Sequence, residues 1–422
     1  METWLFFLGD WQVNPRTNNL RRGDLVRLLE PKAMDVLLLL CAQQGQVLSA
    51  DEIADQCWGD VDIGDNPVHK AINQIRKALG DVPSTPTYIA TIRKRGYHII
   101  AELDFPHDET LKAEKNNWHG ASPFPGLAAF ELKDAPLFFG RNGQIETLLA
   151  GLSKQVSTGH AFCLILGPSG TGKSSLVNAG LLPALTRKNG YDGIGVESFT
   201  SIDFADISHR RLFLDLASAM LDWDVNEQPV FTGMSAEKLA NQLQIDEKAS
   251  VQQCVNALKQ TQQGYSKPRF FLFLDRLEIL LSSAVFSDDE RGVFLGIIDK
   301  LATSGAIIVV SACRNDFYPL VVNCPSLMVN KANGAHLDLL APTRAELLQM
   351  IRLPAVAANL TWSVDPDSAT PLDQMLCAEA ANNPDVLPML QYTLQELYLQ
   401  RSEADELQVS VYTSLGGIEG AI

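Results

Sequence analysis

The sequence predicts a multidomain protein. A small α+β domain is followed by an α/β domain, with a parallel sheet covered by helices on both faces, and then by a helical C-terminal region. Residues 1–104 combine short apolar strand patterns with three helical patterns. From residue 123 onward, apolar strand patterns alternate with helical ones, as they do in parallel sheets. A glycine-rich loop at 167–174 lies between one such strand and a helix.

The first domain is expected to contain three helices and several short strands. Pro31 opens the first helix. Ser49 and Glu52 form a capping box for the second helix, and Asn66 caps the third. Apolar stretches bounded by turn residues predict the strands. These stretches are 4–8, 11–13, 25–28, 88–92 and 97–101.

The third helix and the hairpin after it carry a nucleic-acid signal. One helical face is apolar and should be buried. Its residues are Val68, Ile72, Ile75 and Leu79. The other face and the hairpin tip present side chains that hydrogen-bond base edges and phosphates. These candidate DNA contacts are His69, Lys70, Asn73, Gln74, Arg76, Lys77, Arg93, Lys94 and Arg95. Taken singly, the same features also fit a solvated helix face and a charged edge strand.

Charge along the chain is uneven. The formal net charge of −16 argues against a protein whose whole surface is basic and binds nucleic acid. Between residues 66 and 97, however, six basic residues accompany one acidic residue, Asp81. This local concentration of positive charge favours a DNA-binding surface within an acidic chain.

Residues 1–104 resemble a known DNA-binding family. VHKAINQIRKALGD (68–81) and YIATIRKRGYHI (88–99) resemble the OmpR/PhoB-type domain, particularly its branch without a receiver domain. EPKAMDVLLLLCAQQGQVLSADEIADQCWGD (30–60) resembles the first two helices of that family. The resemblance implies a winged helix-turn-helix, with an N-terminal antiparallel sheet, a recognition helix in the major groove of double-stranded DNA and a C-terminal wing. It implies no phosphorelay control. Arg93 stands where that branch often has proline.

A phosphate-binding loop follows the strand pattern at 161–166. The spacing G-x-x-x-x-G-K-S lets glycines wrap the backbone so that N–H groups point at phosphates. Lys173 supplies charge for the β- and γ-phosphates, and Ser174 supplies a hydroxyl for Mg²⁺. The expected nucleotide-binding residues here are Gly167, Pro168, Ser169, Gly170, Thr171, Gly172, Lys173, Ser174 and Ser175.

Two later strand patterns end in candidate catalytic residues. The pattern at 269–274 ends in Asp275, which with Ser174 is expected to hold Mg²⁺. Glu278 follows three residues later and is placed to prepare the attacking water. The pattern at 306–311 leads to Arg314, a candidate sensor of the γ-phosphate. By itself, Glu278 also fits a helix-capping acid, and Arg314 a surface charge.

Six segments in order resemble the bacterial novel-STAND NTPases, which are signal-transduction ATPases with numerous domains. They are PFPGLAAFELKDAPLFFGR (123–141), ILGPSGTGKSSLVNAGLLPAL (165–185), LFLDRLEIL (272–280), SACRNDFY (311–318), LDLLAPTRAELLQMIRLPA (337–355) and DVLPMLQYTLQELY (385–398). The resemblance implies ATP and ADP as ligands. It also implies adenine contacts at Phe139, Gly140, Arg141 and, in a helical lid, Pro388.

The chain departs from this family at two positions. Ile279 replaces a second acid, and Asp385 replaces a glycine near the lid. Nucleotide binding is therefore a firmer expectation than hydrolysis. The expected domains are the winged helix at 1–104, a linker at 105–122, the NTPase core at 123–335 and a helical lid region at 336–422. The lid region is expected to be incomplete, because the family's lid helices continue at the point where 416–422 stand.

The expected function is that of an ATP-dependent, signal-transducing transcriptional regulator. Two alternatives remain open. One is a STAND ATPase of a conflict or defence system that uses the winged helix for recruitment. The other is a nucleotide-binding DNA-binding protein with little turnover. A homo-oligomer in the ATP state is a candidate assembly.

The remaining composition favours a cytoplasmic protein without membrane contact. No apolar run approaches the ~18–20 residues that span a bilayer. Met1 is followed by Glu2 instead of the basic start of a signal peptide. The seven cysteines include no C-x-x-C pair, so buried reduced thiols are expected.

Overall fold

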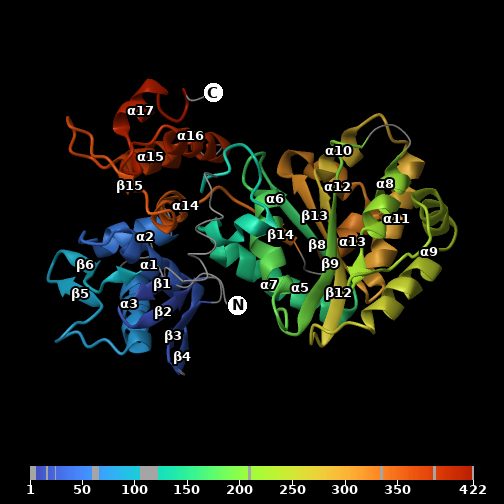
Figure 1. The fold of residues 1–422 in the computed structure, drawn as a ribbon, viewed down its shortest axis with the longest axis horizontal. Helices are drawn as coiled ribbons and strands as arrows, with labels where there is room; N and C mark the ends of the chain where they lie inside the picture. The colour runs from blue at the N-terminus through green and yellow to red at the C-terminus, as the bar shows by residue number, and fades with distance from the viewer. Residues whose placement is uncertain are drawn as a thin grey trace. The chain divides into compact units, whose positions relative to one another are not determined.

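The computed structural model describes residues 6–15, 18–23, 25–58, 66–104, 122–207, 211–332, 336–383 and 386–420. By its internal contacts the chain forms two compact units. Unit 1 combines Met1–Gly143 with Ala341–Ile422, and unit 2 is Gln144–Leu340. The blue and red ends of the chain in Figure 1 therefore belong to the same unit, and unit 2 is inserted between them in sequence.

Unit 1 begins with an antiparallel sheet in the order β4-β3-β2-β1-β7. Its strands are β1 (Phe6–Leu8), β2 (Trp11–Asn14), β3 (Asn19–Arg22), β4 (Leu25–Leu28) and β7 (Leu103–Asp104). The expected strands at 4–8, 11–13 and 25–28 are present, although residues 4 and 5 lie outside the described residues. β3 was not predicted, because Leu20 is its only apolar residue.

Three helices and a hairpin complete the N-terminal domain as expected. They are α1 (Pro31–Ala42), α2 (Ala50–Trp58), α3 (Asn66–Leu79), β5 (Ile89–Ile92) and β6 (Gly96–Ile99). Ser49 and Glu52 form the predicted capping box. The predicted apolar face of α3 is at most 1% exposed. Trp11 in the sheet donates to the carbonyl of Leu79 at 3.1 Å, which fixes the end of α3.

Gly96 sets the position of the hairpin. It has φ = +134°, and a Cβ atom there would lie 1.8 Å from the carbonyl oxygen of Leu48. The backbones of Leu48 and Tyr97 also exchange hydrogen bonds of 2.8 and 2.9 Å. Only glycine permits this approach, which holds the hairpin against the segment before α2.

The remainder of unit 1 is mainly helical. Its elements are η1 (Leu132–Leu137), α14 (Arg344–Ala357), β15 (Thr361–Trp362), α15 (Leu372–Ala381), α16 (Leu387–Leu399), β16 (Glu406–Leu407) and α17 (Val409–Ser414). A capping box between Thr343 and Glu346 starts α14. The apolar residues of these helices share one hydrophobic core with the N-terminal domain. The internal contacts thus group the lid region with the N-terminal domain.

Unit 2 is built on a parallel sheet in the order β14-β8-β13-β12-β9, as predicted. The strands are β8 (Phe162–Gly167), β9 (Ile194–Asp203), β12 (Lys267–Asp275), β13 (Ile307–Arg314) and β14 (His336–Asp338). β14 was not predicted from its three residues. Alternate residues of β8, β12 and β13 pack against helices on one face, and the residues between them are also buried. Both faces of the sheet are therefore covered.

The helices of unit 2 connect these strands (Figure 1). They are α5 (Asn142–Thr158), α6 (Lys173–Ser175), the π-helical η2 (Leu176–Leu181), α7 (Leu182–Thr186), α8 (Leu212–Leu221), α9 (Ala236–Leu258), α10 (Leu277–Ser282), α11 (Asp288–Thr303), η3 (Asn315–Phe317), α12 (Tyr318–Val322) and α13 (Pro325–Ala332). Two short strands, β10 (Asp224–Val225) and β11 (Gln228–Pro229), pair with each other. Within the described part of the chain, no helix has the length and apolar character needed to cross a bilayer. All seven cysteines are free, and six are buried, as predicted.

Candidate nucleotide-binding and DNA-binding sites

The predicted phosphate-binding loop connects β8 to α6 at the carboxyl edge of the parallel sheet. Gly170 and Gly172 have φ values of +75° and +88°, which a residue with a side chain rarely adopts. At Gly167 a Cβ atom would lie 2.7 Å from the carbonyl oxygen of Leu339, whereas nothing lies within 4 Å of one at Gly172. The loop is thus tight on its inner side and open beside Gly172, which suits an anion cradle.

Lys173 is folded back onto this loop. Its ammonium group donates to the carbonyl oxygens of Gly167 and Pro168 at 2.9 and 2.7 Å. Burial lowers the pKa of Lys173, and the nearby carboxylates of Glu278 and Asp275 oppose that shift. An incoming phosphate would therefore replace two neutral acceptors with charged ones.

Ser174 and Asp275 meet although 101 residues separate them. The Ser174 hydroxyl donates to Oδ2 of Asp275 at 2.5 Å. Burial raises the pKa of Asp275, and the charge of Asp203 adds to this shift. A hydroxyl and a carboxylate are hard oxygen donors of the kind that Mg²⁺ takes. These residues therefore fit the predicted metal site, because a cation would offset the cost of the buried carboxylate.

Glu278 and Arg314 also come together, but through the arginine backbone. Glu278 is 6% exposed, and its Oε2 accepts the Arg314 N–H at 3.1 Å. The Arg314 guanidinium instead pairs with Asp316 at 3.0 and 2.7 Å. The sequence reasoning did not consider Asp316, although an acid two residues after Arg314 was a visible signal. Ile279 packs against the apolar core of unit 2.

Asp203 and Arg276 are two further residues that the sequence reasoning missed. Asp203 ends β9 in register with Asp275 on the neighbouring strand. Arg276 has φ = +55° and donates two hydrogen bonds to the Asp203 carboxylate, one of them at 2.5 Å. The arginine thus neutralises the second acid beside Asp275. An arginine directly after the strand acid was the signal that could have revealed this pair.

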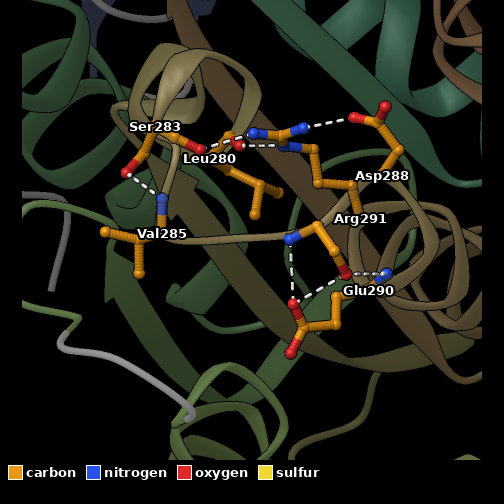
Figure 2. A network of polar contacts seen from close by, with 7 residues as sticks. Leu280, Ser283, Val285, Asp288, Glu290 and Arg291 are labelled. Carbon is orange, nitrogen blue, oxygen red and sulfur yellow. Dashed lines mark hydrogen bonds and ion pairs between the residues drawn. The ribbon is translucent and has the colours of Figure 1, made fainter.

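Arg291 anchors the far end of the helix that carries Glu278. Its guanidinium donates to the carbonyl oxygens of Leu280 and Ser283 at 2.8 and 2.5 Å and pairs with Asp288 at 2.5 Å. Figure 2 shows this network, in which the Arg291 side chain of α11 donates to the carbonyl oxygens of Leu280 in α10 and of Ser283, the C-cap of α10. Helix ends leave such carbonyls without intrahelical partners. Arg291 therefore fixes α10 in place.

Replacing Arg291 with alanine should loosen α10. A buried acceptor without a partner costs roughly 1–3 kcal/mol, so amide exchange in α10 should accelerate about tenfold or more. Hydrogen–deuterium exchange of the full chain measures this. Asp288→Ala is the matched control, since it removes only the partner whose side chain is 99% exposed. Equal protection of α10 in wild type and Arg291→Ala would show that the helix does not depend on this anchor.

The residues that the resemblance assigns to adenine belong to unit 1. Gly140 has φ = +77°, and a Cβ there would lie 2.6 Å from the Glu346 carbonyl oxygen. Arg141 is 2% exposed. Burial lowers its pKa, and the Glu346 carboxylate opposes the shift. Phe139 is half-buried, and Pro388 lies in the first turn of α16. Asp385 lies outside the described residues.

Most candidate DNA contacts face solvent on two adjoining elements. The exposed ones are His69, Lys70, Asn73, Lys77, Arg93, Lys94 and Arg95, whereas Gln74 is half-buried. The His69 Nδ1 lies 2.6 Å from the Tyr97 hydroxyl, which joins α3 to the hairpin. The residues on α3 and at the β5–β6 turn therefore form one polar and basic surface. We call this surface the reading face.

Arg76 differs from the expectation. It is 7% exposed, and its Nη2 donates to the Ile89 carbonyl and the Thr91 hydroxyl, both at 2.8 Å. The guanidinium also lies over the Tyr97 ring. Helical spacing placed Arg76 beside Lys77 on the polar face, but the hairpin folds over this position and covers the side chain. Arg76 thus ties α3 to β5 instead of pointing at phosphates.

Asp81 has a structural role in the same domain. Its carboxylate accepts the backbone N–H groups of Thr87, Tyr88 and Ile89 at 2.7, 3.3 and 2.9 Å. It is 7% exposed. These bonds set the start of β5, so the single acid of the basic segment positions the hairpin.

Comparison with known families agrees with this arrangement. Residues 123–422 match the family described as Novel STAND NTPase 1. The chain belongs to this family. Residues 26–99 match the family described as Transcriptional regulatory protein, C terminal, which is the OmpR/PhoB-type winged helix. This novel STAND NTPase therefore joins a DNA-binding winged helix to a nucleotide-binding P-loop domain with a parallel sheet.

Three relatives each match less than a third of the novel STAND NTPase. The Transcriptional activator CadC of Escherichia coli is 34% identical over 130 residues, which is 31% of this chain and 25% of CadC. The regulatory protein YkoG of Bacillus subtilis is 41% identical over 91 residues, 21% of this chain and 40% of YkoG. The Cholera toxin transcriptional activator of Vibrio cholerae is 32% identical over 79 residues, 18% of this chain and 27% of that protein. The chain thus spans between 25% and 40% of the length of these relatives.

Two solved structures are similar to parts of this chain. The DNA-binding domain of E. coli CadC has a TM-score of 0.23 and 32% identity, and the match covers 24% of this chain and 96% of that one. The ORC2 protein of Aeropyrum pernix has a TM-score of 0.46 and 15% identity, with 67% of this chain and 68% of that one covered.

Proposed function

We propose that this novel STAND NTPase is an ATP-gated transcriptional regulator, in which the nucleotide state of unit 2 controls how the winged helix engages double-stranded DNA. One observation carries the proposal: a single chain combines an exposed basic reading face with a phosphate loop whose Ser174 meets Asp275. CadC and the Cholera toxin activator are both named as transcriptional activators, which supports transcriptional regulation as the function of the winged helix.

The residues of unit 2 fit ATP or ADP with Mg²⁺. The open backbone around Gly172 and the ammonium of Lys173 would hold the β- and γ-phosphates. Ser174 and Asp275 would hold the metal. When bound, Mg²⁺ supplies positive charge that neutralises the charge developing on the phosphates.

Slow turnover is the expected behaviour. Glu278 accepts a hydrogen bond from the backbone of Arg314, which leaves its other carboxylate oxygen for a water molecule. Arg314 must leave Asp316 before its side chain reaches a phosphate. This pairing also favours the second candidate function, a nucleotide-binding DNA-binding protein with little turnover.

Replacing Glu278 with glutamine should reduce hydrolysis by roughly 10²- to 10⁴-fold, the usual contribution of a general base. ATP binding should persist, because the side chain keeps its size and an oxygen for the Arg314 N–H. If the ATP state is a homo-oligomer, the variant should also bind a two-site duplex about 10²-fold more tightly than a one-site duplex, through effective concentration.

Phosphate release and DNA affinity, measured with ATP and with ADP, test both expectations. Glu290→Gln is the matched control, since either residue completes the capping box with Ser287. Identical DNA affinities in both nucleotides and in Glu278→Gln would contradict gating by unit 2. An ATPase that uses the winged helix for recruitment would then be the better-supported function.

A further inference from the structure

Helix α14 is buried along nearly its whole length. Its buried residues are Ala345, Leu347, Leu348, Gln349, Met350, Ile351, Arg352, Leu353, Pro354 and Ala355. A helix that is buried all round has packing partners on more than one side. The lid helix α15 is one partner, α1 and α2 of the winged helix are two more, and η1 also contacts α14. Figure 1 shows α14 beside α2 within unit 1.

Arg352 joins these partners through one side chain. Its Nε donates to the Asp373 carboxylate of α15, and its Nη1 donates to the carbonyl oxygen of Ala42, the last residue of α1. Arg352 is only 7% exposed. A cation is favourable there, because the last carbonyls of a helix lack intrahelical partners and carry partial negative charge. The buried guanidinium is therefore satisfied by the lid and the winged helix together.

A second point of approach lies six residues earlier on α14. Burial raises the pKa of the Cys57 thiol in α2, and the carboxylates of Asp35 and Glu346 add to the shift. Helix α2 also packs directly against α14, as α1 does. The contact between α14 and the winged helix therefore involves two helices of that domain.

This contact leaves the reading face uncovered. The residues Lys70, Asn73 and Lys77 on α3 are exposed, and so are those at the tip of the β5–β6 hairpin. The Arg352 bond is made by Ala42, the last residue of α1. A winged helix held in this way keeps its recognition helix available for DNA.

We propose that the surface formed by α1 and α2 is a docking site for the lid helix α14, with Arg352 as its anchor. The winged helix and the lid then move as one body. A nucleotide that moves the lid would carry the reading face with it, so the ligand positions the DNA reader instead of covering it. This last consequence rests on the proposed function, whereas the docking itself does not.

Docking can be tested by cutting the chain between the two partners. A protease site is inserted between residues 105 and 122 of the full chain, the protein is cleaved, and the products are separated by gel filtration. We expect the N-terminal fragment to stay bound in the wild type. In a variant that combines Arg352→Leu with Asp373→Leu, the N-terminal fragment should dissociate more readily. The concentration at which half of it is released should be at least tenfold higher than in the wild type.

The double substitution removes the anchor without leaving an unpaired charge. Losing one partner of a buried pair is far more disruptive than replacing both with apolar residues. Far-ultraviolet circular dichroism confirms that the variant is folded. Arg344→Leu is the matched control, since it removes the same charge from an exposed position on the same helix. Release of the fragment from the cleaved wild type, or equal retention by the folded double variant, would overturn the docking proposal.

A second measurement separates this proposal from the proposed function. DNA affinity is measured with ADP and with ATP for the uncut wild type and the double variant. We expect the two nucleotides to differ in the wild type, and their ratio to fall to about one in the variant. If the fragment stays bound after cleavage but the wild type binds DNA equally well with ATP and with ADP, the result would support docking and contradict gating. Equal ratios above one in both proteins would overturn the view that docking transmits the nucleotide state.

Discussion

Replacing Lys173 with alanine is expected to weaken ATP binding about 100-fold. Its ammonium group is the cation that the loop places for the phosphates, and a charge-assisted hydrogen bond contributes about 1.5–3 kcal/mol. In the structure it donates to two carbonyls of its own loop, so binding exchanges these for charged oxygens. Calorimetric titration of the full chain with ATP and Mg²⁺ measures the loss.

The matched control is Lys154→Ala, which removes an exposed lysine from α5 in the same unit. It should bind ATP like the wild type. Circular dichroism should show that Lys173→Ala remains folded, because the side chain contacts the loop and not the apolar core. Unchanged ATP affinity in a folded Lys173→Ala protein would show that the loop does not bind phosphates in the expected way.

Arg76→Ala and Lys77→Ala are expected to affect DNA binding for different reasons. Loss of Arg76 leaves the Ile89 carbonyl without its donor, at a cost of about 2 kcal/mol. Amide exchange in β5 and β6 should then accelerate roughly 30-fold. Lys77 is exposed, so its loss should leave exchange unchanged and reduce the slope of log affinity against log salt by about 0.9.

Hydrogen–deuterium exchange and a salt titration on one duplex separate these effects. Asn73→Ala serves as a third comparison, since loss of a base-edge contact should relax sequence preference without changing the salt slope. The assignment of Arg76 as a structural residue would be wrong if Arg76→Ala kept normal amide exchange and reduced the salt slope by about 0.9, the change expected for one phosphate contact.

Local patterns predicted much of the fold. The capping box at Ser49, the apolar face of α3 and the glycine spacing of the phosphate loop each depend on residues a few positions apart. Strands β8, β12 and β13 of unit 2 were visible because each contains a continuous apolar run. β14 was missed because its three residues, with exposed His336 and Asp338, form a strand only by pairing with β8.

The candidate sites show the same limit. Local sequence identified Ser174 and Asp275, because Ser174 is part of the phosphate-loop motif and Asp275 ends an apolar strand pattern. It placed Arg76 on the reading face because helical periodicity does not report the hairpin that covers it. Arg352 was not singled out, since its partner Ala42 lies 310 residues away. Contacts at that separation depend on tertiary packing, which no local pattern records.

The insertion of unit 2 between the two parts of unit 1 has a consequence during protein synthesis. The ribosome completes the winged helix near residue 104, and α14 begins at Arg344, which is 240 residues later. At the usual pace of translation this interval lasts roughly 10 to 50 s. During that time α1 and α2 present their apolar surface without the helix that finally covers it. Nascent chains that stall within unit 2 would therefore expose an apolar surface, which chaperones bind.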